Sequence, residues 1–380
     1  MPTPPLTEKD MREVVEAYKA NGYSKKLAAE AMGMKPGTFD HRFMRAVMAG
    51  LDNEIVHSAP AGHQIKGVST LYNQDGSLRQ QWVKTKTDGP DLDQIIEAIK
   101  GAFDEYQGSA EPTFAPEVAD AELVTVYPLA DWHVGLLAWG REVGEDWDLS
   151  IAERDIRQSM ERLVASSPRS STAVVLGLGD LLHSDNYDGV TSRSKHRLDV
   201  DGRYPKVLQT AVKLVVHTIE LALQKHEQVL VRLIPGNHDD QSAIAVTLAL
   251  AARYDGHPRV KVDDDPGRFW WWRFGKVFLG AAHGDIAKMK DLPLIMASRH
   301  PEDWGASKHR LIFTGHIHHR EKLNAREFGD VDVESFNSPT AKDAYSHGAG
   351  FVSKRSVHSL TFHEMDGEIS RSRVAIVQNS

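Results

Sequence analysis

Five short blocks in the C-terminal two-thirds of the chain combine carboxylate, carboxamide and imidazole side chains, and each comes after an apolar run. The blocks are Asp131-Trp132-His133, Gly179-Asp180, Gly236-Asn237-His238-Asp239, His283-Gly284 and Gly315-His316-Ile317-His318. Oxygen and imidazole donors of this kind suit manganese, iron or zinc better than calcium. Because the chain has no cysteine, thiolate ligands are excluded. Together the blocks predict one site for two divalent cations.

The spacing within the blocks suits shared ligation. In an extended segment residues i and i+2 point to the same side, so Asp131 with His133, and His316 with His318, can each supply two ligands. Asp180 has two oxygens with which it can bridge two cations. Each block is expected just past the carboxyl end of a strand, where open α/β sheets bind their ligands.

A purely structural interpretation is adequate for some blocks taken singly. A Gly-Asp after a strand is usually a turn, and an isolated histidine such as His283 is usually structural. The Gly-Asn-His-Asp and Gly-His-x-His blocks are rarer, and packing gives no reason for histidines at two strand ends. The combination therefore favours a metal site.

The elements that must position these blocks alternate between strands and helices. Short β-rich apolar runs predict buried strands at residues 123–130, 173–178, 229–234, 277–282 and 311–314. Amphipathic helices are expected at residues 151–165, 205–225, 241–253 and 286–299, with further strands at 331–336 and 356–362. This alternation predicts an α/β catalytic domain over residues 121–380.

The N-terminal part has a different pattern of predicted secondary structure. Three helices are predicted at residues 6–22, 24–32 and 38–49, with a β-hairpin after them at 65–84 and a helix at 91–106. Helices plus hairpin resemble a winged-helix domain over residues 1–106, and residues 107–120 have the composition of a linker. Four residues around the third helix are expected to contact nucleic acid: Lys35, His41, Arg42 and Arg45. Dimerisation or docking remains the alternative, because 12 Lys plus Arg stand against only 10 Asp plus Glu over residues 1–90.

Composition limits the remaining choices. A chain of 380 residues suggests two domains, and its net charge of -8 argues against coating nucleic acid through bulk positive charge. Neither a signal peptide nor a run of about 18 apolar residues is evident, so a cytoplasmic protein without a membrane partner is expected.

In order and spacing, the blocks resemble the signature of the calcineurin-like metallophosphoesterase superfamily: D-x-H, G-D, G-N-H-[DE], H and G-H-x-H. The match covers about residues 121–365, and the layout is most similar to SbcCD-type repair exonuclease subunits and phage-encoded phosphoesterases. The resemblance implies a four-layer αββα sandwich, in which two mixed sheets lie between helices. It also allows a homodimer.

The resemblance further implies how the two cations are held. One ion would be bound by Asp131, His133, Asp180 and His318. The second would be bound by Asp180, Asn237, His283 and His316. Manganese is the favoured metal, with iron, zinc or magnesium as alternatives.

The implied reaction is hydrolysis of a phosphate ester. Two divalent cations against Asp131 and Asp180 leave about +2 at the site, enough to hold a phosphate and to acidify a bridging water. The resulting hydroxide would attack phosphorus in line. His238 matches the family's non-ligand histidine and would protonate the leaving alkoxide as general acid. Asp239 is expected either to orient His238 or to cap the next helix.

The residues after the second block narrow the choice of substrate. The chain lacks the G-D-x-V-D-R-G extension of the protein serine/threonine phosphatases, so that class is disfavoured. Substrate contacts are expected from His183, Asn186, Arg193, Lys195 and Arg197. The predicted function is a nuclease acting on DNA or RNA. The alternatives are a phosphodiesterase for small cyclic or oligomeric nucleotides and a non-catalytic metal-binding scaffold.

Overall fold

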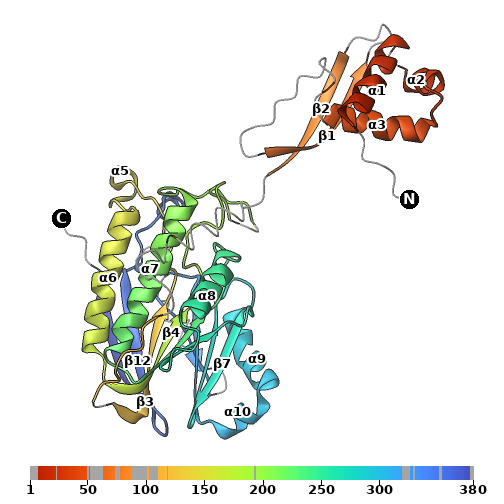
Figure 1. Ribbon diagram of the computed structural model, residues 1–380. Coiled ribbons are helices and arrows are strands. Elements are labelled where there is room, and N and C mark those ends of the chain that lie inside the picture. The colour runs from red at the N-terminus through yellow and green to blue at the C-terminus, as the bar shows by residue number, and fades with distance from the viewer. Residues whose placement is uncertain are drawn as a thin grey trace. The chain divides into compact units, whose positions relative to one another are not determined.

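The computed structural model describes most of the chain in two compact units, Met1–Asp91 and Leu92–Ser380 (Figure 1). The described residues are 7–22, 24–48, 51, 63–72, 78–87, 101, 110–117, 119–191, 194–318, 326–327, 330–350 and 353–376. No helix among them is long and apolar enough to cross a membrane.

Among its described residues, the first unit has three helices and a two-stranded antiparallel sheet, in agreement with the helices predicted at residues 6–49 and with the hairpin. Its elements are α1 (Glu8–Ala20), α2 (Lys25–Ala31), α3 (Pro36–Met48), β1 (His63–Tyr72) and β2 (Leu78–Thr87). Thr7 and Ser24 cap α1 and α2 through their side chains. Helix α3 begins at Pro36, two residues earlier than expected, because proline suits the first helical turn.

A small apolar core joins the three helices of this unit. Its buried members are Val14, Val15, Tyr18, Ala28, Ala29, Phe39, Phe43 and Ala46. The rings of Tyr18 and Phe43 lie 4.4 Å apart between centroids, so α1 and α3 pack directly. The helix expected at residues 91–106 lies outside the described residues, apart from Gly101.

The second unit is built on two mixed sheets. The larger has the order β13-β12-β3-β4-β5-β6, with β3 to β6 parallel and β12 antiparallel to β3. Its strands are β3 (Asp120–Leu129), β4 (Ser170–Gly177), β5 (Gln228–Leu233), β6 (Val260–Asp263), β12 (Ser356–His363) and β13 (Gly367–Ala375). The smaller has the order β10-β11-β9-β8-β7. Its strands are β7 (Phe269–Phe274), β8 (Val277–Ala282), β9 (His309–Thr314), β10 (Arg326–Glu327) and β11 (Asp332–Ser335).

Helices cover the outer face of each sheet. Those associated with the larger sheet are α6 (Leu149–Ser166), α7 (Tyr204–Leu223) and α8 (Ser242–Arg253). Those associated with the smaller sheet are the 3-10 turn η1 (Met289–Asp291), α9 (Leu292–Arg299) and α10 (Pro301–Ala306). Two short helices, α5 (Gly140–Val143) and α11 (Ala344–Gly348), lie in connections. The helix expected at residues 286–299 is therefore shorter, since regular α-helix begins only at Leu292.

Alternation along β3 explains the layers. Val124 and Val126 face the core between the two sheets, whereas Tyr127 and Leu129 face the core beneath the helices. Both sheets contribute to the inner core, and each outer face is covered by helices in Figure 1. The predicted four-layer α/β sandwich is confirmed.

Three consecutive tryptophans contribute to this packing rather than to an open surface. Trp270 is buried between the sheets and Trp272 packs against the same core, with their ring centroids 6.0 Å apart. Trp271 points to the other face, where its ring lies 5.8 Å from that of Phe269. All three rings are therefore engaged in packing.

The described part of the expected linker is attached to the second unit. Ala110 is buried there and donates its N–H to the carbonyl of Arg253 at 2.9 Å. The guanidinium of Arg259 donates to the carbonyls of Thr113 at 3.0 Å and Phe114 at 2.7 Å. These described residues of the predicted linker at 107–120 are thus docked on the second unit, a contact that composition does not reveal.

Candidate metal centre

The predicted ligands lie in five loops that leave the carboxyl ends of β3, β4, β5, β8 and β9. Five of these ligands have left-handed backbone conformations: Asp131 (φ 49°), His133 (φ 41°), Asp180 (φ 53°), His316 (φ 68°) and His318 (φ 53°). Such conformations cost roughly 1 to 3 kcal/mol each in a non-glycine residue. Because this strain is concentrated in the ligand loops, the turns are selected for where they place the ligand side chains and not for their own backbone stability.

The first group consists of Asp131, His133 and His318, whose candidate ligand atoms lie within 4.8 Å of one another. The Nε2 atoms of His133 and His318 are 2.9 Å apart, and His318 Nε2 lies 3.4 Å from Asp131 Oδ1. Two nitrogens bound to one metal at about 2.0 to 2.1 Å are separated by roughly this distance. Burial lowers the pKa of His133, which keeps the ring neutral, as a ligand must be.

The second group consists of Asp180, His283 and His316, joined by the amide oxygen of Asn237. His283 Nδ1 lies 2.8 Å from the carbonyl of Leu178 and donates to it, so a neutral ring has a lone pair at Nε2. That nitrogen faces Asn237 Oδ1 at 3.0 Å and Asp180 Oδ2 at 3.2 Å. Three lone pairs pointing at one another require a cation between them.

Electrostatics support the same conclusion. Burial alone would lower the pKa of His283, but Asp180 and Asp131 outweigh it and raise the pKa to about 10. Burial alone would raise the pKa of Asp180, yet His283 and its other histidine neighbours hold it well below the ordinary value. Without a metal the site attracts a proton in its place, so the donor set fits divalent cations.

Asp180 faces both groups. Its Oδ2 lies 3.2 Å from His283 Nε2 and 3.9 Å from His133 Nε2, while Oδ1 accepts the N–H of His238 at 2.9 Å. The residues present would therefore let one carboxylate serve two ions.

Two glycines make this close approach possible. A Cβ added to Gly236 would collide with the carboxylate and backbone nitrogen of Asp180. A Cβ at Gly179, whose φ is +92°, would lie 2.5 Å from His283 Nδ1. Alanine at either position would displace a ligand.

Asp239 does not orient His238, which corrects the first expectation for this residue. The carboxylate of Asp239 is fully buried and accepts four backbone N–H groups. These bonds come from Gly236 at 2.8 Å, Asp180 at 3.1 Å, Leu181 at 2.7 Å and Leu182 at 3.3 Å. Asp239 thus ties the loop after β4 to the loop after β5 and holds the backbone of a ligand.

The alternative role for Asp239, as a side-chain cap of the next helix, belongs instead to Asp185. The carboxylate of Asp185 accepts the N–H groups of Gln241 at 2.9 Å and Ser242 at 2.8 Å, at the start of α8.

Burial, together with the charge of Asp180, raises the pKa of Asp239 to about 7.

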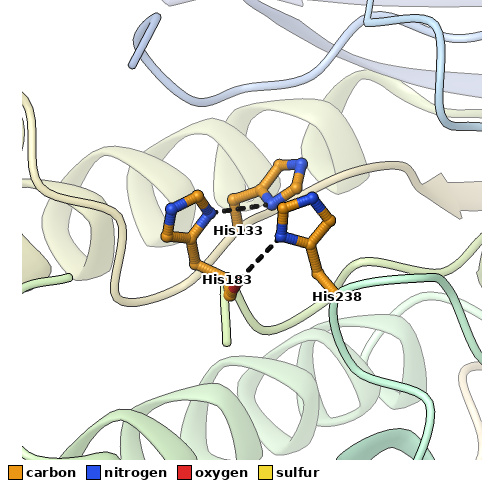
Figure 2. A group of neighbouring side chains, drawn as sticks. All are labelled: His133, His183 and His238. Atoms are coloured by element: carbon orange, nitrogen blue, oxygen red, sulfur yellow. Dashed lines mark hydrogen bonds between the residues drawn. The ribbon is translucent and has the colours of Figure 1, made fainter. Parts of the chain in front are cut away.

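His238 lies beside the first group, with a different partner (Figure 2). Its Nδ1 donates to the carbonyl of His183 at 2.8 Å, which fixes the ring so that Nε2 is the remaining nitrogen. His183 Nδ1 lies 3.2 Å from His133 Nδ1, and burial lowers the pKa of His183 to about 3. Among the described residues, the buried Nε2 of His183 has no hydrogen-bond partner. His183 thus positions both a ligand and the candidate general acid.

A cavity of about 440 Å³ opens above these groups. Its lining includes metal-binding candidates and residues from two loops, at 191–198 and 338–346. Of the expected substrate contacts, His183 and Arg197 line it. Lys195 is exposed outside this lining, and Arg193 lies outside the described residues.

Asn186 is placed away from the cavity, contrary to expectation. It lines a separate cavity of about 180 Å³. Its amide donates to the carbonyl of Val190 at 3.0 Å and accepts the N–H of Asp188 at 3.0 Å. Both ends of the amide therefore stabilise its own loop.

Sequence reasoning missed the loop after β11. Ser338 donates its hydroxyl to the carbonyl of Asp131 and Thr340 to that of Trp132, each at 2.6 Å. Lys342 and Tyr345 from the same loop line the cavity. No motif marks this segment, because its contribution depends on the pairing of β11 beside β9.

The four expected nucleic-acid contacts lie on or next to α3 in the first unit. Lys35, His41 and Arg45 are exposed, and Arg42 is half-buried.

Comparisons with known proteins give structural likeness only. No family model matches the chain, and no curated protein matches it. Vps29 from Chaetomium thermophilum matches with a TM-score of 0.28 and 13% identity, over 68% of this chain and 100% of its own. A single mutant of Vps29 from Entamoeba histolytica gives 0.27 and 14%, over 67% and 98% of the two chains.

A third match is a protein from Staphylococcus aureus described as a 5'-nucleotidase, in complex with alpha-ketoglutarate. Its TM-score is 0.32 at 11% identity, over 68% of this chain and 55% of that one. At these scores the likeness identifies no residue correspondence and no activity.

Proposed function

We propose that the chain is a metal-dependent phosphodiesterase that hydrolyses nucleic acid. One observation carries the proposal: two ligand groups, both faced by Asp180, lie at a cavity that His238 also lines. When bound, a pair of divalent cations at these groups supplies positive charge for a phosphate ester and acidifies water. Manganese is the metal we favour.

The side chains of the site have two roles, metal binding and proton transfer. Asp131 and Asp180 are buried carboxylates that require compensating positive charge, and their histidine neighbours complete the ligand set. His238 has Nδ1 engaged by the carbonyl of His183, so its Nε2 can transfer a proton. As the oxygen of water attaches to phosphorus and the bond to the leaving oxygen breaks, His238 donates its proton to that oxygen.

Basic residues support nucleic acid as the substrate. Arg197 and Lys342 line the cavity, where they can neutralise backbone phosphates next to the scissile one. In the first unit, the exposed side chains of Lys35, His41 and Arg45 offer a second basic surface. A winged-helix role in nucleic-acid binding for this unit is part of the proposal.

A small cyclic or oligomeric nucleotide is the second candidate substrate. The cavity volume of about 440 Å³ favours it, because pockets for small ligands occupy roughly 300 to 1,000 Å³. Both candidates share the same phosphodiester chemistry.

Turnover by the purified full chain tests the proposal. The protein is stripped with a chelator, reconstituted with manganese, iron, zinc or magnesium, and given bis-p-nitrophenyl phosphate, single-stranded DNA, duplex DNA, RNA and a cyclic dinucleotide. We expect metal-dependent hydrolysis of the model ester and of at least one polymer.

Hydrolysis of the model ester and the cyclic dinucleotide alone would replace the nuclease proposal with the second candidate. No turnover with any metal would contradict the enzymatic proposal and favour a metal-binding scaffold.

A further inference from the structure

The cavity above the metal centre contains two aromatic rings that the hydrolytic chemistry leaves unused. Tyr345 lies on α11 and is 70% exposed, although a tyrosine ring normally gains stability by burial. The ring of His196, from the loop at residues 191–198, lies 6.2 Å from it between centroids. Both residues line the cavity that also contains the candidate ligands His133 and Asp180. An aromatic surface is thus exposed in the same cavity as the metal groups.

The backbone that carries Tyr345 is well fixed. Asp343 caps α11, since its Oδ1 accepts the N–H of Ser346 at 2.7 Å. The carbonyl of Tyr345 accepts the N–H of Ala349 at 2.9 Å. The ring is therefore presented on an ordered turn without serving a buried core, which is the arrangement expected of a recognition surface.

Charge in the same cavity suits a phosphorylated ligand. Arg197 and Lys342 line it, and neither forms an ion pair within the described part of the chain. The carboxylate of Asp343 also lines the cavity, and its Oδ1 accepts the N–H of Ser346 in α11. Cations, a metal centre and an exposed ring are together the groups that recognise phosphate and nucleobase.

We propose that Tyr345 stacks on the nucleobase of the nucleotide attached to the scissile phosphate. The inference rests on the proposed function and narrows the substrate to base-bearing phosphodiesters. A base held between two rings would need about 7 Å between their centroids, given stacking distances of roughly 3.5 Å. The rings of Tyr345 and His196 are 6.2 Å apart and tilted by 38°. The base therefore packs on the exposed face of Tyr345, with His196 supporting the other side.

Matched substrates with and without a base test this directly. The full chain with manganese is given a thymidine dinucleotide and an analogue in which an abasic tetrahydrofuran residue replaces the nucleoside next to the scissile phosphate. Stacking on an aromatic side chain predicts a preference in kcat/KM of roughly 5- to 150-fold for the dinucleotide. Tyr345→Ala should bring this ratio close to one, whereas Tyr345→Phe should retain it.

Phe114→Ala is the control, because this ring is 99% exposed and does not line the cavity. It should leave the ratio unchanged. Repeating the pair within a longer single-stranded oligonucleotide distinguishes the source of the base. A loss of preference in the oligonucleotide assigns the surface to a polymer, and a loss in the dinucleotide alone assigns it to small nucleotides. An unchanged ratio for Tyr345→Ala in both substrates overturns the inference.

A binding measurement separates this inference from the proposed function. If the wild-type chain hydrolyses neither substrate, the proposed activity fails, but calorimetry with thymidine 5'-monophosphate and deoxyribose 5-phosphate still tests the ring. Tighter binding of the nucleotide that Tyr345→Ala abolishes supports base stacking. Equal affinity of the wild-type chain for both probes contradicts it.

Discussion

Replacing Asp239 by asparagine removes one of the two carboxylate oxygens that tie the loop after β4 to the loop after β5. Oδ1 accepts N–H groups from Gly236 and Asp180, and Oδ2 accepts those of Leu181 and Leu182. An asparagine has one acceptor oxygen, so it can satisfy one pair, and its own NH2 group then faces the other two donors.

The expected cost comes from those two orphaned donors. A buried N–H left without an acceptor costs about 1 to 3 kcal/mol, so Asp239→Asn should lose about 2 to 6 kcal/mol of unfolding free energy. The loop that carries Asp180 loses its attachment to the loop after β5. Metal affinity should therefore fall together with stability.

Urea denaturation of the chelator-treated full chain gives the free energy, and calorimetric titration with manganese gives the affinity. Asp255→Asn provides the control, because it makes the same chemical change at an exposed position. An Asp239→Asn chain within about 0.5 kcal/mol of wild type, with unchanged affinity, would refute the account of these loops.

Three further predictions concern single positions. Gly236→Ala should abolish binding of manganese, because its Cβ collides with Asp180, whereas Gly305→Ala, with nothing within 4 Å of the added Cβ, should bind normally in the same titration. His238→Ala should retain its metals but lose roughly 100- to 10,000-fold in kcat; full activity would remove the general-acid role. Burial depresses the pKa of His226 from 6.5 to about 4, so an unfolded chain takes up this proton first as the pH falls. This contribution to the free energy of unfolding is complete above pH 6.5 and is lost as the pH falls toward 4. Between about pH 7.5 and about pH 4.5, urea titrations should show that wild type loses about 2.5 kcal/mol more of this free energy than His226→Gln. Equal losses in the two chains would contradict the prediction.

The strand-and-loop organisation of the second unit could be predicted because its inner strands are buried on both faces. The second half of β4 and the whole of β8 are apolar, and each strand is followed by a polar block. Parallel neighbours bring those ends to one edge of a sheet, so Asp131 and Asp180 could be expected to converge.

Strand β13 could not be predicted from the sequence, because it lacks the apolar run that marks the inner strands. It is an edge strand that carries several charged residues, among them Glu368, Arg371 and Arg373, so its apolar content is low. Its pairing with β12, which the sequence does not encode locally, makes it a strand.

The partners of polar side chains could not be predicted from spacing. Asp239 comes directly after His238 in the chain, yet its carboxylate turns toward the amides of a different loop. Asn186 lies near Asp180 in sequence, but its amide is used within its own turn. Tyr345 belongs to the cavity only because β11 returns beside β9.

The central claim is that two ligand groups sharing Asp180 bind two divalent cations. Elemental analysis of the purified chain, reconstituted with manganese and freed of excess metal, measures this directly. The account predicts two bound ions per chain in wild type and fewer in a chain carrying Asp180→Ala. One ion or none per wild-type chain would contradict it.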